Sequence, residues 1–227
     1  MSFIMPSRRS TTNLLQASGE LWSEDAEQSP LQVIVLTPGP PTDARVEAVL
    51  SAAIQLAPDD IALHRVDIDA LPPFAADLSD CPEAETVQRF REEISVGDGF
   101  LLVAAADDAD EQALLARALR WAATPAGEDA LTGLPVVWLG LGGDPNALTT
   151  ARLQIQAAVE AGGGVMPDDA AALTAPLAGD WSGRLGPTGR LDDISTRQAI
   201  GQVLIRLRQM AFSGEDDIPA SKDETAG

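Results

Sequence analysis

The stretch VIVLTPGPPTDARVEAVL, residues 33–50, joins an apolar run, a turn rich in proline and an amphipathic segment. The apolar run is rich in β-branched residues, which is typical of a strand buried on both faces of a sheet. After the turn, apolar residues recur with the 3.6-residue period of a helix, at Val46, Val49, Leu50, Ala53 and Ile54. The stretch therefore predicts a strand, a short turn and a helix.

The same alternation continues along the chain. Strands are predicted at 31–37, 61–68, 99–105, 135–141 and 163–167, and later helices at 82–95, 108–123, 146–161 and 192–212. The run 99–105 is the most apolar and is expected at the centre of the sheet, whereas 168–191 is predicted as a loop. The last helix is expected to bury Ile194, Ile200, Val203, Leu204, Leu207 and Met210. Strands that alternate with helices indicate an α/β fold, a doubly wound parallel sheet with helices on both faces.

The ends of the chain differ from this pattern. Residues 1–30 are polar and weakly patterned, and we expect a flexible N-terminal arm. Residues 213–227 are predicted to form a disordered acidic tail, which leaves 31–212 as one domain.

Composition restricts the classes of partner. The formal net charge is −20, with 35 acidic and 15 basic residues, which disfavours nucleic acid and anionic membranes. No apolar run approaches the ~20 residues of a membrane-spanning helix. Cys81 is the only cysteine, which fits a reducing cytoplasm. Arg8 and Arg9 are not followed by an apolar segment, so we expect no export signal and a cytoplasmic protein.

In an open α/β sheet, ligands bind at the carboxyl ends of the strands, at the point where the strand order reverses. The loops to consider follow the first, third and fourth strands and begin at Thr37, Ala104 and Gly140.

Several blocks, in the same order along 31–212, resemble the NADPH-dependent FMN reductase family. They are VDIDALPPFAADL (66–78), PEAETVQRFREEISVGDGFLLV (82–103), ALLARALRWAA (113–123), GLPVVWLGLGG (133–143) and GRLDD (189–193). The resemblance implies a flavodoxin-like fold with strand order 2-1-3-4-5. It also implies non-covalent FMN, hydride transfer from NADPH to the flavin, and a homodimer or homotetramer. Because the cofactors carry that chemistry, no catalytic side chain is predicted.

The first loop of the family, G-S-x-R-x-x-S-x-N, holds the FMN phosphate at a helix N-terminus, where unpaired N–H groups are available. The corresponding run here is TPGPPTDAR (37–45), so the resemblance places Thr37, Gly39, Thr42 and Arg45 at the phosphate. Two properties oppose this placement. The prolines of this run offer no N–H. The Asp43 carboxylate, at ~4 Å from a phosphate oxygen, would cost about 4 kcal/mol per unit charge at an effective dielectric of 20.

The same turn has a second interpretation as a simple helix start. Pro41 presets the backbone, Thr42 is an acceptable N-cap, and Asp43 in the first turn suits the helix dipole. Both interpretations remain open at this point.

The two remaining loops have similar alternatives. The family's P-E-Y-N-x-S loop aligns with AADDAD (105–110), which places Ala105 and Asp107 at the flavin ring. The aspartates would also suit the acidic start of a helix, or a divalent cation site. Gly142 and Gly143 would let the backbone approach a flat ligand, or would serve a turn.

Other single residues favour structural roles. His64 lies in the middle of a predicted strand and is interpreted as a sheet residue rather than a catalyst. Trp121 and Trp138 are expected in the core, and Trp181 in the core or at an interface. Because both flavin loops depart from the family pattern, the alternative to a reductase is a binding or scaffolding subunit without flavin.

Overall fold

The computed structural model describes residues 29–39, 43–74, 84–123, 130–142 and 144–213. Almost all of the predicted arm and tail, together with Thr42, Cys81 and Gly143, lie outside the described residues.

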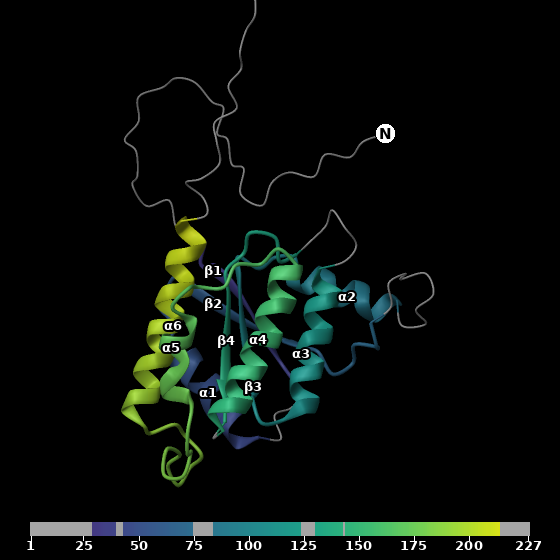
Figure 1. Cartoon of the computed structure of the whole chain (residues 1–227). Helices are drawn as coiled ribbons and strands as arrows, with labels where there is room; N and C mark the ends of the chain where they lie inside the picture. The colour runs from purple at the N-terminus through teal and green to yellow at the C-terminus, as the bar shows by residue number, and fades with distance from the viewer. Residues whose placement is uncertain (1–28, 40–42, 75–83, 124–129, 143, 214–227) are drawn as a thin grey trace, which may run out of the picture.

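The described strands form one parallel sheet in the order β2-β1-β3-β4. They are β1 (Leu31–Thr37), β2 (Ile61–Asp67), β3 (Gly99–Ala105) and β4 (Val136–Leu141), each within a residue of its predicted bounds. Thr37 is paired with Asp67 at the carboxyl ends of β1 and β2, and Ala105 with Leu141 at those of β3 and β4. The carboxyl ends of all four strands therefore meet at one edge of the sheet (Figure 1).

The predicted fifth strand at 163–167 is wrong within the described residues. The segment forms a single parallel bridge, between Val165 and Pro135, beside β4. Gly163 adopts a φ of 73°, Pro167 has no N–H to donate, and Val165 is 46% exposed. The glycines and the proline leave too little chain with strand geometry and too little buried surface to extend the sheet.

The helices are α1 (Ala44–Leu56), α2 (Ala84–Ile94), α3 (Ala109–Ala122), α4 (Pro145–Ala161), α5 (Ala170–Thr174) and α6 (Ile194–Ser213). A short 3₁₀ helix, η2 (Ala175–Leu177), follows α5. The prediction of an unbroken loop over 168–191 is therefore wrong, since its alanine-rich start favours helix and Leu177 is fully buried. Within the described ranges, no helix is both long enough and apolar enough to cross a membrane.

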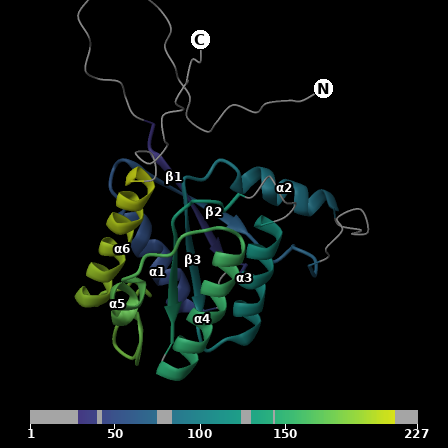
Figure 2. The ribbon, with the colours of Figure 1, turned by 45° about the horizontal axis from the view of Figure 1, so that its top comes forward.

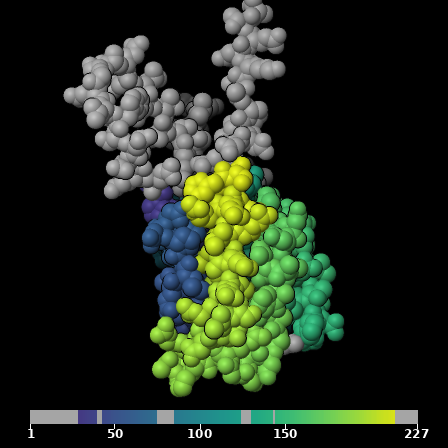
Figure 3. Space-filling view, turned by 90° about the vertical axis from the view of Figure 1, so that its left-hand side faces the viewer, coloured from purple at the N-terminus to yellow at the C-terminus, as the bar shows by residue number. Residues whose placement is uncertain are grey.

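Helices cover both faces of the sheet, as predicted. α1, α5 and α6 lie over one face, and α2, α3 and α4 over the other (Figures 1 and 2). Figure 3 shows α6, in yellow, between α1 in blue and the green segments that follow β4. Every residue of β3 is buried, which confirms its predicted central position.

Tryptophan side chains are buried in the apolar clusters on both faces of the sheet. Trp121 and Trp138 are 1% exposed, and the Trp121 indole N–H donates to the carbonyl of Pro72 at 3.0 Å. Trp181 is 9% exposed and donates its indole N–H to the carbonyl of Leu177 at 3.0 Å. The core placement predicted for Trp121 and Trp138 is confirmed, and Trp181 belongs to the cluster under α1 and α6.

Two residues predicted to face inward are exposed. Ile54 is 67% exposed because the buried face of α1 also includes Ala48 and Ala52, which turns Ile54 outward. Ile194 is 71% exposed because it is the first residue of α6 and lies before the buried stretch of that helix.

This difference predicts contrasting effects for two aliphatic residues four positions apart on α1. Leu50→Ala should lower the free energy of unfolding by about 2–5 kcal/mol, because it empties space in the core. Ile54→Ala, at an exposed position, should change it by less than about 0.5 kcal/mol. Urea unfolding followed by circular dichroism measures both values, and equal losses would contradict the orientation of α1.

Candidate functional site

A cleft opens where β1 and β3 end and α1 and α3 begin. Its volume is about 450 Å³, which lies within the range of small-molecule sites. The residues that line it are Asp43, Ala44, Arg45, Ala105, Asp107, Asp108 and Glu111. Three of the residues predicted at the flavin, Arg45, Ala105 and Asp107, are therefore brought together from segments that are about 60 residues apart.

Arg45 is held by two carboxylates. Its Nη2 donates to Asp43 Oδ2 at 2.5 Å and to Asp107 Oδ1 at 3.2 Å, and its Nε contacts both Asp43 oxygens at 2.9 and 3.1 Å. The hydrogen bond from Arg45 holds the pKa of the Asp43 carboxyl below its usual value, and Asp43 raises the pKa of Arg45. The only arginine lining the cleft is thus already paired on two sides.

Asp43 also begins α1. Its carboxylate accepts the backbone N–H of Arg45 at 2.7 Å, and α1 starts at the next residue, Ala44. Asp43 is therefore the N-cap, the position that the sequence interpretation gave to Thr42, and not a first-turn residue. An aspartate is among the best N-cap residues, and its carboxylate satisfies one of the N–H groups at the start of α1 without a ligand.

The N–H of Gly39 is bound by a side chain that follows β2. It donates to Asp69 Oδ1 at 2.7 Å, while Arg65 Nη2 donates to the carbonyl of Gly39 at 2.7 Å. A Cβ at Gly39 would lie only 1.6 Å from Asp69 Oδ2, so this position requires glycine in the present arrangement. Thr37 is fully buried and donates its hydroxyl to the carbonyl of Pro38 at 3.3 Å. The structure does not bring Thr37 or Gly39 into the lining of the cleft.

Sequence reasoning missed Asp69 and Arg65. A signal was available, because the pairing of parallel strands places the end of the second strand beside the turn after the first, and VDIDAL (66–71) contains two aspartates, Asp67 and Asp69.

The backbone of Ala105 is held by two buried side chains of α3. Its N–H donates to Glu111 Oε2 at 2.7 Å, and its carbonyl accepts from Gln112 Nε2 at 2.6 Å. Glu111 and Gln112 are 9% and 7% exposed. Asp108 is the N-cap of α3 and accepts the N–H groups of Asp110 and Glu111, which confirms the interpretation of an acidic helix start. The Asp108-x-x-Glu111 spacing resembles a capping box and was the signal for Glu111, although its carboxylate reaches Ala105 instead of the N-cap.

Gly142 lies next to the cleft without lining it. A Cβ at Gly142 would be 3.4 Å from Asp107 Oδ1, which is ordinary contact distance, and its carbonyl accepts the N–H of Gly179 at 2.9 Å. Gly142 therefore leaves room beside Asp107, while the predicted role of Gly143 lies outside the described residues.

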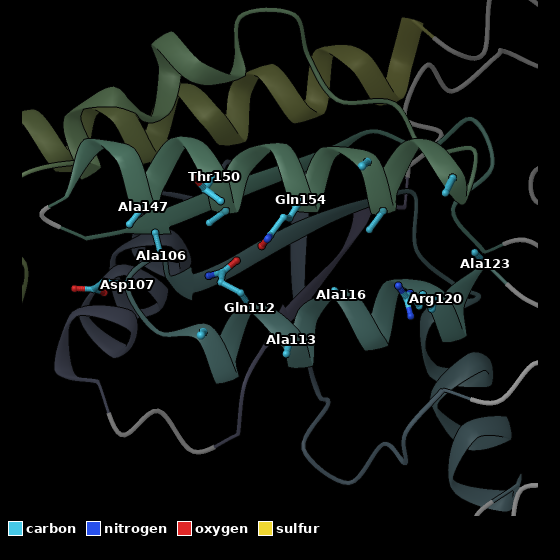
Figure 4. A pocket seen from close by; sticks show the side chains of 15 residues that line it. Ala106, Asp107, Gln112, Ala113, Ala116, Arg120, Ala123, Ala147, Thr150 and Gln154 are labelled. Carbon is cyan, nitrogen blue, oxygen red and sulfur yellow. The ribbon is translucent and has the colours of Figure 1, made fainter.

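A larger groove runs between α3 and α4 and shares Asp107 with the cleft (Figure 4). Its volume is about 930 Å³, and most of its lining residues are alanines. Gln112 and Gln154 point into it between the two helices (Figure 4). Gln112 Oε1 is buried and has no hydrogen-bond partner within the described part of the chain.

His64 lies outside the cleft. It is an exposed residue of the edge strand β2, and its Nε2 lies 2.5 Å from Gln32 Oε1. Among the described residues, no group of three His, Cys, Asp or Glu side chains is placed to hold a metal ion.

The cleft can be tested against the phosphate of FMN. Four carboxyl groups and one guanidinium line it, and that guanidinium is paired with two of the carboxylates. A phosphate oxygen ~4 Å from one carboxylate is repelled by about 4 kcal/mol per unit charge at an effective dielectric of 20. The described residues, as arranged, do not fit a phosphate dianion.

Burial raises the pKa of Glu111, the N–H of Ala105 opposes that shift, and Asp108 adds to it. A raised folded-state pKa means that the folded protein binds the Glu111 proton more tightly than the unfolded chain does. This contribution to the free energy of unfolding is therefore lost as pH rises above about 4.5 through the raised pKa.

Glu111→Gln removes this titration and keeps an oxygen that can accept the Ala105 N–H. Relative to the native chain, the free energy of unfolding of the variant should increase as pH rises from 4.5 to neutrality. Urea unfolding at several pH values measures this difference. Glu160→Gln, on the exposed side of α4, serves as the control for the exchange of a glutamate for a glutamine. A difference between Glu111→Gln and the native chain that does not vary with pH would contradict the prediction.

No protein-family model matches this chain, but it is similar to proteins of known activity or structure. Over 111 residues it is 31% identical to a 2-hydroxy-1,4-benzoquinone reductase from a Burkholderia species. That match covers 48% of this chain and 60% of the relative. In three dimensions the chain is similar to FerB, a flavoenzyme NAD(P)H:(acceptor) oxidoreductase from Paracoccus denitrificans. The TM-score is 0.62 at 20% identity, over 81% of this chain and 98% of FerB. The chain thus resembles a quinone reductase in sequence over about half its length and shares the flavodoxin-like α/β fold of FerB.

Proposed function

We propose that this chain is an NAD(P)H-dependent oxidoreductase that uses non-covalently bound FMN to reduce a flavin or quinone acceptor. The observation that carries the proposal is the position of the cleft, between the carboxyl ends of β1 and β3. β2 lies on one side of β1, and the chain then crosses to β3 on the other side. The strand order therefore reverses between β1 and β3, which is the switch point of the sheet. Flavodoxin-like sheets bind their ligand at that point.

The relatives support the reaction class. One is a benzoquinone reductase and the other an NAD(P)H:(acceptor) oxidoreductase, and both names describe electron transfer to an acceptor. In such a reaction NAD(P)H gives up a hydride. A quinone gains two electrons and two protons, the second proton coming from water, and becomes a hydroquinone. FMN, when bound, supplies the redox chemistry, and the chain supplies the cleft that holds the reactants. A cytoplasmic location remains part of the proposal and fits the single cysteine.

The activity is tested by following the oxidation of NADPH and NADH at 340 nm with FMN and 1,4-benzoquinone. Turnover should exceed that of a mixture without protein. Ala44→Trp places a large ring in the cleft and should lower kcat/KM by at least about tenfold, because it occupies the space of the reactants.

Ile54→Trp, at an exposed position on the same helix, is the matched control and should leave kcat/KM unchanged. No turnover above background with either nucleotide, in protein that is folded, would overturn the proposed activity. Unchanged turnover in Ala44→Trp would place the activity elsewhere.

We also propose that the protein is a homodimer or homotetramer in which the groove between α3 and α4 forms a subunit contact. Small side chains let helices of two copies approach closely, and Gln112 Oε1 would gain a donor there. Because the groove shares Asp107 with the cleft, this contact would border the site.

Light scattering should give a mass that is a multiple of 23.7 kDa. Ala116→Arg, in the groove, should shift the protein towards monomer, because a buried unpaired guanidinium is costly. Ala172→Arg, at an exposed position of α5, should leave the mass of the assembly unchanged. A native protein that is monomeric at micromolar concentration would refute the proposal.

A further inference from the structure

We propose that the cleft binds flavin through its uncharged part, and that Asp43 and Asp107 prevent the 5′-phosphate from adding affinity. FMN and riboflavin should then bind almost equally well. This inference rests on the proposed function, because it concerns the ligand of the same cleft. It assigns Asp43 and Asp107 a role in specificity.

The first argument is the state of Arg45. A phosphate at the start of α1 would need this guanidinium, because no other basic group among the described residues lines the cleft. Asp43 and Asp107 hold it at 2.5 and 3.2 Å, from α1 and from the loop after β3. The side chains of Arg45 and Asp43 are only 24% and 21% exposed, so water screens their interaction incompletely. A phosphate can pair with Arg45 only by displacing the carboxylates of Asp43 and Asp107, which already bind that guanidinium.

The second argument concerns backbone donors. An anion site in a turn requires several N–H groups that point to the ligand. Pro38, Pro40 and Pro41 have no N–H, and the N–H of Gly39 is bound by Asp69. At the start of α1, the N–H of Arg45 is bound by Asp43. In this part of the chain three residues thus have no N–H, and the N–H groups of Gly39 and Arg45 are bound by carboxylates of this chain.

The third argument is the remaining charge. Asp108 and Glu111 extend the acidic lining beyond the Arg45 pairs. A dianion entering the cleft meets these carboxyl groups, whereas a neutral ribityl hydroxyl can donate hydrogen bonds to the same oxygens. The lining therefore suits hydroxyl groups better than a phosphate. The chemistry of these residues favours the ribityl hydroxyls, which FMN and riboflavin have in common, over the phosphate, which only FMN has.

The test compares the two flavins directly. Titration of the purified full chain with FMN and with riboflavin, followed by quenching of flavin fluorescence, gives both dissociation constants. In the native protein we expect them to agree within about threefold, because the phosphate adds no net favourable contact.

Asp43→Asn and Asp107→Asn then isolate the carboxylates. Asparagine is as good an N-cap as aspartate, so the start of α1 is retained in Asp43→Asn. Each variant frees Arg45 from one charge and should increase FMN affinity about tenfold, with riboflavin affinity changed less than twofold. Asp169→Asn is the matched control. It removes an aspartate paired with Arg206 at 3.3 Å on α5 and α6, outside the cleft, and should alter neither constant.

The outcomes separate this inference from the proposed function. Binding of FMN about thirtyfold or more tightly than riboflavin would overturn the inference and leave the proposed function standing. Similar binding of both flavins with no gain for FMN in either variant would overturn the role of Asp43 and Asp107. Binding of neither flavin, together with no turnover, would overturn the proposed function itself.

Discussion

The burial of β3 on both faces determines where polar chemistry can occur in this protein. All seven residues of the strand are buried, between two helical layers that each form a separate apolar cluster. A charged side chain within those layers would lose its hydration without a partner, at a cost of several kcal/mol. Charges therefore gather where the strands end. The switch between β1 and β3 places the starts of α1 and α3 at this edge, and the cleft follows from that arrangement.

The groups at that edge bind mainly one another. Arg45 joins the start of α1 to the loop after β3, Gly39 is tied to β2 through Asp69, and Glu111 holds the backbone of Ala105. Each contact satisfies a donor that an anionic ligand would otherwise use. The edge is therefore already organised without a ligand. Any molecule that binds there must either replace carboxylates as acceptors or use surfaces that they leave unbound.

The sequence was sufficient for the layers of the fold because these depend on apolar periodicity. The four strands of the sheet and the predicted helices have their expected places, since each contributes a continuous run or a stripe to the core. The segment around Val165 was wrongly predicted to be a strand, because the prediction relied on its few apolar residues and gave too little weight to the neighbouring glycines and proline, which limit pairing. Ile54 was misplaced because small alanines widened the buried face of α1 in a direction that a count of large residues does not show.

The site was harder to predict, because its contacts join residues distant in sequence. The family resemblance placed Arg45, Ala105 and Asp107 at one ligand, and the structure brings all three to one cleft. The resemblance could not show that Asp69 binds the N–H of Gly39, which lies 30 residues away in sequence. Similarly, the Asp108-x-x-Glu111 spacing indicates a cap, whereas the acceptor role of Glu111 towards Ala105 depends on how α3 packs on β3. Such cross-element bonds are decided by packing.

The fold and the ligand are therefore supported by different parts of this chain. Apolar segments produce the FerB-like arrangement at 20% identity, because many sequences can fill the same layers. The cleft, by contrast, depends on a few charged residues whose sign decides what can enter. Asp43 and Asp107 lie on either side of Arg45, so the guanidinium that the family resemblance places at a phosphate is paired with two carboxylates. Under the proposed function, the flavin would therefore draw its binding energy from its uncharged part rather than from its phosphate.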